Sequence, residues 1–261
     1  MAKREIENAR VIVTGASSGI GREVAKELAR QKARLVITAR REDRLRQLAD
    51  EIGNEGGRAE YVAGDITDPE VRAKTLEMAR YSYGGLDILV NNAGVGAMGL
   101  FEEANPDRVR QLMEVNFFSL VEMTRLALPL LRQGTAPILV NVSSILGHRG
   151  VPHNSEYAAS KFAVQGFSEA LRAELVQRGI DLLVVSPGTT ETEFFDRVIE
   201  NTGAPKWPKH KMVSAEAVAK QTVQAIRQGR SEITPYFWGK ILLGLNRLSP
   251  RFVDRLMTKY V

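Results

Sequence analysis

The chain has 261 residues, 44% of them apolar, and a formal net charge of +5. That length and apolar content suffice for one large core, and no Pro/Gly/Ser-rich linker or repeat divides it. The absence of cysteine excludes disulfides and thiolate chemistry. The start of the chain lacks the apolar core of a signal peptide, and no apolar run is long enough to span a membrane. We expect a soluble, cytoplasmic protein that does not bind nucleic acid, since its positive charge is modest and distributed.

Short β-branched runs alternate with amphipathic stretches along the chain. Helical periodicity begins near Ile20 and recurs over Arg41–Gly53, Val109–Leu131 and Phe162–Leu175. This alternation predicts an α/β fold, a doubly wound Rossmann-type parallel sheet with helices on both faces. Ligands of such sheets bind at the carboxyl ends of the strands. The expected strands are Val11–Val13, Leu35–Ile37, Tyr61–Val62, Leu86–Val90, Ile138–Val142 and Leu182–Val185.

A glycine-rich segment, Thr14 to Gly21, follows the first expected strand. Its Gly-x-x-x-Gly-x-Gly spacing permits a tight turn and lets a pyrophosphate approach the backbone at the positive end of the next helix. The alternative is a glycine-rich loop without a ligand, which the position at the first strand-to-helix turn disfavours. The sequence therefore predicts a dinucleotide cradle formed by Gly15, Ser17, Ser18, Gly19, Ile20 and Gly21.

Tyr157 and Lys161 stand one helical turn apart, thirteen residues after Ser144. Reducing a ketone needs hydride at carbon and a proton at oxygen, and an unperturbed tyrosine is a poor base at neutral pH. The charge of Lys161 is expected to lower the tyrosine pKa, and Ser144 can donate a hydrogen bond to the substrate oxygen. A second such pair, Tyr236 and Lys240, has neither the serine nor a coupled glycine motif. We therefore assign the proton transfer to Tyr157.

These motifs, in this order, resemble those of the short-chain dehydrogenase/reductase family from Ala9 to about Thr234. Val36 to Arg41 looks closest to the 11β-hydroxysteroid dehydrogenase-like members and their broad carbonyl-reductase relatives. The resemblance implies that Lys161 binds the nicotinamide ribose and that Asn116 holds a water linking this lysine to solvent. The catalytic residues implied are Asn116, Ser144, Tyr157 and Lys161.

Cofactor choice depends on the end of the second strand, where an acid would repel a 2′-phosphate. This chain has Ala39, Arg40 and Arg41 there. Arg40 can pair with a phosphate and stack on adenine, although both arginines could instead begin a solvated helix. We expect NADP(H) in preference to NAD(H). By resemblance, the other cofactor-binding residues are Asp65, Ile66, Asn92, Ala93, Gly94, Tyr157, Lys161, Pro187, Gly188, Thr190 and Thr192.

Other reactive side chains support no second chemistry. Ser143 and Ser144 point to opposite faces of a strand, so Ser143 is expected only to support the site. No histidine-aspartate relay accompanies either serine, which disfavours a hydrolase. The three histidines show no ligand-like spacing with carboxylates, and we expect no metal: His148, His153 and His210.

We expect residues 1–234 to form the Rossmann-type domain, with a substrate lid at about 190–213. Aromatic side chains in the lid, Phe194, Phe195 and Trp207, suggest an apolar or bulky substrate. Residues 235–261 are expected to form a basic amphipathic helical extension. Its apolar stripes should pack on a neighbouring subunit or over the substrate mouth, and contact with an anionic membrane surface is the second choice. The family resemblance implies a homo-dimer or homo-tetramer.

The leading hypothesis is an NADP(H)-dependent enzyme that transfers hydride between nicotinamide and a small-molecule ketone or secondary alcohol, with tyrosine as general acid/base. One alternative is a reductase of the 3-oxoacyl-carrier-protein type, whose family members share the same motifs. Another is a scaffold or sensor that binds NADP(H) without turnover. The complete set of four proton-handling residues favours an enzyme.

Overall fold

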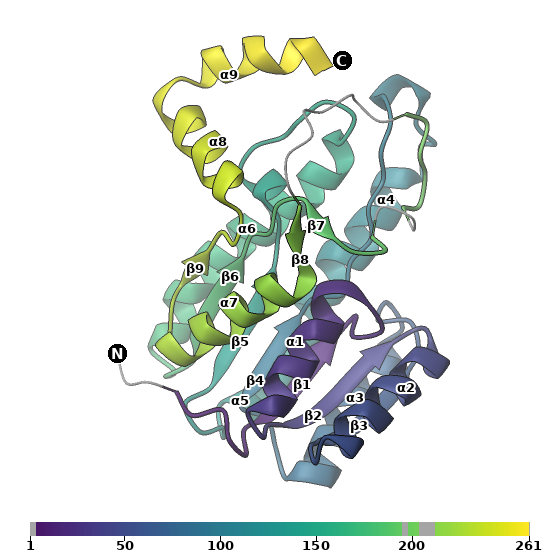
Figure 1. Cartoon of the computed structure of the whole chain (residues 1–261), viewed down its shortest axis with the longest axis vertical. Coiled ribbons are helices and arrows are strands. Elements are labelled where there is room, and N and C mark those ends of the chain that lie inside the picture. Colours follow the sequence, from purple (N-terminus) through teal and green to yellow (C-terminus); the bar gives the residue numbers. More distant parts are fainter. Residues whose placement is uncertain (1–3, 195–197, 204–211, 261) are drawn as a thin grey trace.

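The computed structural model describes residues 4–194, 198–203 and 212–260. Within them, a seven-stranded parallel sheet has the order β3-β2-β1-β4-β5-β6-β9 (Figure 1). The predicted doubly wound sheet is confirmed, with an additional short edge strand, β9. The strands are β1 (Arg10–Thr14), β2 (Arg34–Ala39), β3 (Arg58–Ala63), β4 (Ile88–Asn91), β5 (Ile138–Val142), β6 (Asp181–Val185) and β9 (Glu232–Ile233).

Helices cover both faces of the sheet (Figure 1). On one face, α1 (Gly19–Arg30), α2 (Glu42–Asn54) and α7 (Ala215–Gln228) bury apolar residues such as Leu28, Leu45 and Val223. On the other, α3 (Pro69–Tyr83), α5 (Ser119–Leu131) and α6 (Ser155–Val176) bury residues such as Met123 and Leu175. Near-continuous apolar strands lie between these layers, as parallel sheets require.

The chain changes direction across the sheet at β1. From β1 it proceeds to β2 and β3, then returns to place β4 on the other side of β1. The crevice at the carboxyl ends of β1 and β4 is therefore the topological switch point, where open α/β sheets bind ligands. Thr14 ends β1 and Asn91 ends β4, directly before the two expected cofactor segments.

The stretch Val109–Leu131, expected to be one helix, is helical throughout but contains a π-helical turn. It consists of α4 (Arg108–Met113), a π-helical turn (Glu114–Phe118) and α5, joined end to end. A π turn inserts an extra residue into the helical ladder and occurs often at functional sites. Asn116 lies in the middle of this turn.

Two helices follow the sheet, α8 (Phe237–Leu248) and α9 (Pro250–Met257), and project beyond the carboxyl ends of the strands (Figure 1). Pro250 opens α9 as its first residue, and the Ser249 side chain makes no capping hydrogen bond. None of the helices in the described part of the chain has the length and apolar composition needed to cross a membrane.

Candidate active site

The glycine-rich turn joins β1 to α1 in a tight conformation. Gly15 and Gly19 have φ values of +66° and +55°, a left-handed region that favours glycine. The amide of Asn92 donates to the carbonyl oxygens of Thr14 (2.9 Å) and Gly15 (3.2 Å). A side chain at Gly21 would collide with that amide, so this glycine provides close packing. The turn therefore presents its backbone at the N-terminal end of α1, where an anion is favoured.

Arg41, rather than Arg40, reaches the glycine-rich turn. Its guanidinium donates to the hydroxyls of Ser17 (3.0 Å) and Ser18 (2.7 Å). It also forms an ion pair of 3.0 Å with Glu193. Arg40 is exposed at the end of β2. The geometry thus places one of the two expected arginines in direct contact with the cradle.

Three of the residues expected to bind the cofactor, Asp65, Asn92 and Ala93, are held by local contacts. Asp65 accepts hydrogen bonds from the backbone N–H (2.9 Å) and the hydroxyl (2.8 Å) of Thr67. The backbone N–H groups of Asn92 and Ala93 both donate to the Thr14 hydroxyl at 3.0 Å. The end of β4 is thereby fixed to the end of β1, across the crevice where an adenosine would lie.

Tyr157 lies on the first turns of α6 and shares a side-chain hydrogen bond with Ser144, which follows β5. The ammonium of Lys161 lies 5.8 Å from the centre of the tyrosine ring. Ser143 turns the other way and donates to the backbone carbonyl of Lys161 at 3.2 Å. The side chains of Ser143 and Ser144 therefore point in different directions, as expected for adjacent residues at the end of a strand.

Burial sets the proton affinities of this group. Desolvation raises the pKa of the Tyr157 phenol to about 12, opposed by the hydrogen bond with Ser144. Desolvation lowers the pKa of Lys161 to about 8, and its ammonium donates to the carbonyl of Val142 at 3.1 Å. The expected lowering of the tyrosine pKa by Lys161 is not found in the protein alone. Loss of solvent is the larger effect.

Asn116 is held inside the π turn and is almost fully buried. Its side-chain oxygen accepts from the N–H of Val95 (2.8 Å), and its amide donates to the carbonyl of the same residue (2.9 Å). The amide also donates to the Ser160 hydroxyl at 2.9 Å, and Ser160 is the residue before Lys161. Asn116 thus connects the segment after β4 to the helix that carries the tyrosine and lysine.

The segment after β6 closes the crevice from the other side. A Cβ at Gly19 would lie 3.1 Å from the Thr192 side chain, so Thr192 packs directly on the glycine-rich turn. Thr190 donates to the carbonyl of Gly188 at 3.0 Å. A side chain at Gly188 would collide with the ring of Tyr236, which is buried. The second Tyr-x-x-x-Lys pair therefore includes a packing tyrosine.

The expected lid begins beside the tyrosine. The ring of Phe194 lies 5.8 Å from that of Tyr157, centre to centre. Residues 198–203 pair with the segment after β4, where the Ile199 N–H donates to the Gly96 carbonyl at 2.7 Å. Phe195 and Trp207, the other two aromatic residues named for the lid, lie outside the described residues.

A buried ion pair that sequence patterns did not predict flanks Tyr157. Arg108 donates to both carboxylate oxygens of Glu156, at 3.0 and 2.9 Å. It also donates to Glu200 at 2.9 Å, so it joins α4, the first turn of α6 and the segment 198–203. The Arg108 side chain is 1% exposed. Its partners are distant in sequence, and no periodicity or short motif indicates them.

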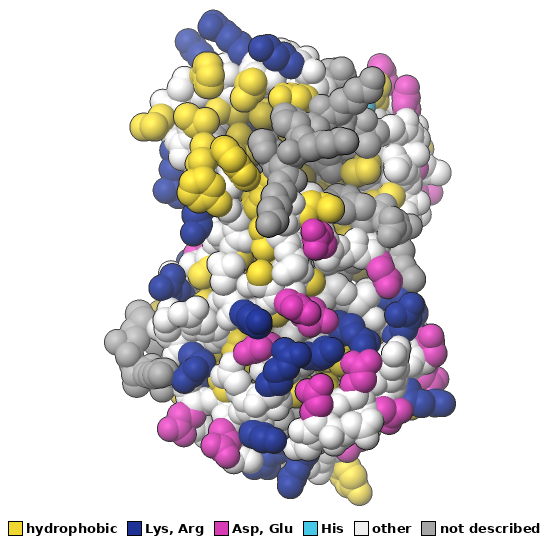
Figure 2. Space-filling view, viewed as in Figure 1, with side chains coloured by type: hydrophobic (Ala, Val, Ile, Leu, Met, Phe, Trp, Pro, Cys, Tyr) yellow, Lys and Arg dark blue, Asp and Glu magenta, His cyan; other side chains and the backbone are white. Residues whose placement is uncertain are grey.

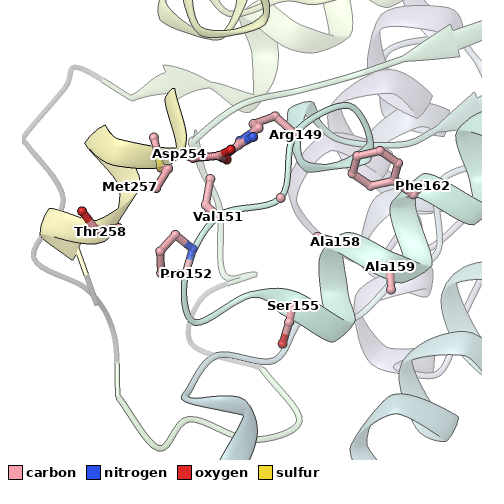
Figure 3. Close-up of a pocket in the computed structure, with 11 residues that line it drawn as sticks. Arg149, Val151, Pro152, Ser155, Ala158, Ala159, Phe162, Asp254, Met257 and Thr258 are labelled. Atoms are coloured by element: carbon pink, nitrogen blue, oxygen red, sulfur yellow. The ribbon is translucent and has the colours of Figure 1, made fainter. Parts of the chain in front are cut away.

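Arg149 anchors the tail to the body. It donates to Asn246 of α8 (3.1 Å) and to Asp254 of α9 (2.6 Å). Next to this contact is an open, mainly apolar cavity of about 490 Å³, lined by Val151, Phe162 and Met257 among others (Figure 3). Neither Ser144 nor Tyr157 lines it. The cavity is a gap between α9 and the start of α6, separate from the candidate site.

The two histidines in the described part of the chain, His148 and His153, lie outside the group around Tyr157. His148 lies 3.0 Å from the Ser186 hydroxyl and 3.1 Å from the Glu232 carboxylate. His153 ends a turn with φ +63°, and His210 lies outside the described residues. Where the structure describes the chain, no three His, Cys, Asp or Glu side chains come together as a metal site.

A family model described as short chain dehydrogenase matches residues 9–203. The chain belongs to this family. Ketoacyl reductase HetN of Nostoc sp. is 30% identical over 253 residues, covering 94% of this chain and 87% of HetN. An 11-beta-hydroxysteroid dehydrogenase of Pinus massoniana is 40% identical over 191 residues, covering 72% of this chain and 53% of that protein. The resemblance inferred from the motifs is confirmed, and the family supports an oxidoreductase.

Two solved structures share the architecture. A short-chain dehydrogenase/reductase from Burkholderia phymatum in complex with NAD has a TM-score of 0.87 at 24% identity, covering 95% of this chain and 96% of that one. A short-chain dehydrogenase from Burkholderia cenocepacia in complex with NADP has a TM-score of 0.79 at 29% identity, covering 88% and 97%. The fold is therefore that of proteins that bind either nicotinamide dinucleotide.

Proposed function

We propose that this protein is an NADP(H)-dependent oxidoreductase that reduces a ketone, or oxidises the corresponding secondary alcohol, with Tyr157 as the general acid/base. The observation that carries the proposal is the shared hydrogen bond of Tyr157 and Ser144 beside the buried Lys161. Tyrosine, serine and lysine side chains on an exposed surface would not be held together in this way. A half-buried phenol beside a buried hydroxyl, with a buried amine 5.8 Å from the phenol ring, can act as a proton-transfer group.

The residues at the switch point fit a nicotinamide dinucleotide. The left-handed Gly15 and Gly19 leave the backbone accessible at the N-terminus of α1, where a pyrophosphate is favoured. The Lys161 ammonium has three donors, of which the bond to Val142 uses one, so it can also bind ribose hydroxyls. When bound, the reduced nicotinamide supplies the hydride. Asp65, Ile66, Asn92, Ala93, Gly94, Pro187, Gly188, Thr190 and Thr192 would form the rest of its site.

The protein side of the reaction follows from the pKa values. With a pKa of about 12, the Tyr157 phenol is protonated at neutral pH and is ready to donate to a substrate oxygen. Ser144 donates a second hydrogen bond to that oxygen and stabilises its developing charge. Lys161, with a pKa of about 8, still carries its charge at neutral pH and favours the phenolate that remains. Asn116 holds the π turn against Ser160 and would order a water next to the lysine.

Preference for NADP(H) is supported by Arg41. Its guanidinium already contacts Ser17 and Ser18, so a 2′-phosphate there would meet a cation and two hydroxyls. The only carboxylate that Arg41 contacts among the described residues is that of Glu193, which begins the lid. A phosphate would compete with Glu193 for the same guanidinium, whereas a ribose hydroxyl would not. The phosphate gains a charge-assisted contact that the hydroxyl lacks.

A panel of ketones assayed with NADPH and NADH tests the function. We expect the absorbance of the reduced nicotinamide to fall with apolar or bulky ketones, and faster with NADPH. A protein that binds NADPH in calorimetry but turns over no carbonyl compound would instead be a scaffold or sensor.

A second candidate is reduction of a 3-oxoacyl thioester, because the relative HetN is named a ketoacyl reductase. The discriminating substrates are an acetoacetyl thioester and a simple ketone of similar size. Preference for the thioester by more than about tenfold in kcat/KM would favour this candidate. Phe194, which packs beside Tyr157, favours the apolar ketone.

A further inference from the structure

The tail has an apolar face that the rest of the described chain does not cover. On α8, Gly239, Leu242 and Leu243 turn toward the protein body. Apolar residues at helical spacing lie on a second side of the same helix and are exposed, from Ile241 at 38% to Leu248 at 86%. We call this set the outer stripe; it consists of Trp238, Ile241, Leu245 and Leu248, with Phe237 and Phe252 beside it.

The tail was expected to pack its apolar stripes on a neighbouring subunit or over the substrate mouth, and in the single chain the outer stripe is exposed. A helix that packs on its own domain normally buries its apolar side and exposes its polar side. Here α8 is apolar on both sides, and α9 buries Val253 and Met257 while exposing Phe252. Large exposed apolar patches mark sites of interaction. The patch is visible in Figure 2, where apolar side chains gather over α8 and α9.

The charge around the outer stripe is mainly positive. From residue 237 to the end, the sequence has five cations and one acid, Asp254, which gives 5 − 1 = +4. Asp254 is paired with Arg149 of the body, at 2.6 Å. Figure 2 shows Lys and Arg along the edges of the apolar patch, whereas the lower half of the same face mixes both signs. The cations are Lys240, Arg247, Arg251, Arg255 and Lys259.

We propose that the outer face of α8 and α9 docks on the surface of an anionic lipid bilayer. The outer stripe would enter the boundary between headgroups and acyl chains, and the surrounding cations would contact the headgroups. Aromatic residues such as Trp238 and Phe252 suit this boundary. A second copy of the chain is a poorer occupant, because two tails facing each other would bring together two groups of five cations.

The anchoring of the tail supports docking as a preformed unit. Arg149 holds both α8 and α9 through Asn246 and Asp254, and Tyr236 fixes the start of α8 against Gly188. The outer stripe is therefore presented on a fixed support, without any need to unfold the site. The proposal does not depend on the reaction proposed above.

Co-sedimentation of the full chain with vesicles tests the proposal. We expect binding to phosphatidylcholine vesicles that contain 30% phosphatidylglycerol as a chosen composition, roughly the anionic fraction needed for a clear surface potential. Binding to pure phosphatidylcholine should be much weaker. Binding should also fall at about 1 M salt, where the Debye length is about 3 Å. Equal binding to both vesicle types, or to neither, would overturn the proposal.

Variants then separate charge from apolar contact. R251Q/R255Q should weaken partitioning about 30-fold, because each surface cation contributes roughly a fivefold factor. Ile241→Ser combined with Leu245→Ser should abolish binding while leaving the circular dichroism unchanged. The matched controls are K74Q/R125Q and Tyr81→Ser, at exposed positions on α3 and α5, and they should bind like the wild type. Controls that weaken binding equally would refute a role for the tail.

Fluorescence gives a measurement that needs no change in the tail. The chain has two tryptophans, so Trp207→Phe leaves Trp238 as the sole reporter. Its emission should shift to the blue when anionic vesicles are added and return at high salt. The emission could instead shift to the blue without vesicles, as the protein concentration rises. If light scattering then showed a doubled mass that Leu245→Ser abolishes, a second copy of the chain would cover the outer stripe.

Discussion

The phenol of Tyr157 is half-buried beside the side chain of Ser144, and a single oxygen atom distinguishes it from phenylalanine. Tyr157→Phe should lower kcat by about 10²–10⁴-fold, the usual contribution of a general acid. NADPH affinity should stay within a few-fold, since the phenol contacts the substrate. Stopped-flow kinetics and calorimetry measure the two quantities.

Tyr236→Phe is the matched control for that substitution. The Tyr236 ring packs against Gly188, and phenylalanine keeps this packing. Catalysis should remain near normal. A loss comparable to that of Tyr157→Phe would mean that the proton donor has been assigned to the wrong residue.

The two neighbouring arginines differ in their contacts, and this difference predicts cofactor preference. Arg41→Asp should weaken NADPH much more than NADH, because it removes the guanidinium at Ser17 and Ser18 and adds a repelling carboxylate. Arg40→Asp, at an exposed position, should change the NADPH/NADH ratio less. Calorimetric titration of both cofactors decides between them, and the reverse ranking would transfer the role to Arg40.

The lowered pKa of Lys161 predicts a pH-dependent cost in stability. Its pKa is about 8 in the folded protein and 10.5 without burial. The folded state therefore binds fewer protons between these values, and the destabilisation is fully present below pH 8 and vanishes above 10.5. Lys161→Met should raise the free energy of unfolding at pH 7 by about 1–3 kcal/mol, after allowance for the lost hydrogen bond to Val142. This gain should shrink by pH 10 in urea titrations; a constant gain would contradict the assignment.

At the scale of elements, Arg108 joins α4 to α6 with a side chain 1% exposed. Arg108→Met would leave the Glu156 carboxylate buried without its partner and should cost about 3–5 kcal/mol. Adding Glu156→Gln removes the unpaired charge and should recover part of the loss. Urea midpoints of the two variants test this coupling. Additive losses in the double variant would show that the two side chains act independently.

The sequence predicted the sheet and its six longer strands because buried parallel strands appear as continuous apolar runs, such as Ile138–Val142. The π turn around Asn116 was not predictable, since one extra residue in a helical ladder leaves no clear trace in the periodicity. The Tyr157 group was predictable because its members share a short spacing. Arg108 was not, because Glu156 and Glu200 are brought to it only by tertiary folding.

At the scale of the whole molecule, the long helices also expose apolar residues. Phe118 and Leu126 on the π turn and α5, and Phe162 on α6, are between 44% and 48% exposed. We propose that these helices form the subunit interface of a homo-dimer or homo-tetramer. Phe118→Glu with Phe162→Glu should lower the mass measured by light scattering, because each places a charge in the interface. Tyr81→Glu on α3 is the control, and a wild type already of monomer mass would refute the interface.

The π turn has a consequence for changes in chain length. Deleting one residue near Val115 would restore an unbroken α-helix with ordinary hydrogen bonding, which is locally the better helix. The five residues of the π turn rotate the chain about as far as four α-helical residues do, so Arg108 would keep its direction relative to α5 and its pairing with Glu156. The bulge itself would be lost, and with it the position of the Asn116 amide against Val95 and Ser160. A single-residue deletion here should therefore leave the fold intact but displace Asn116.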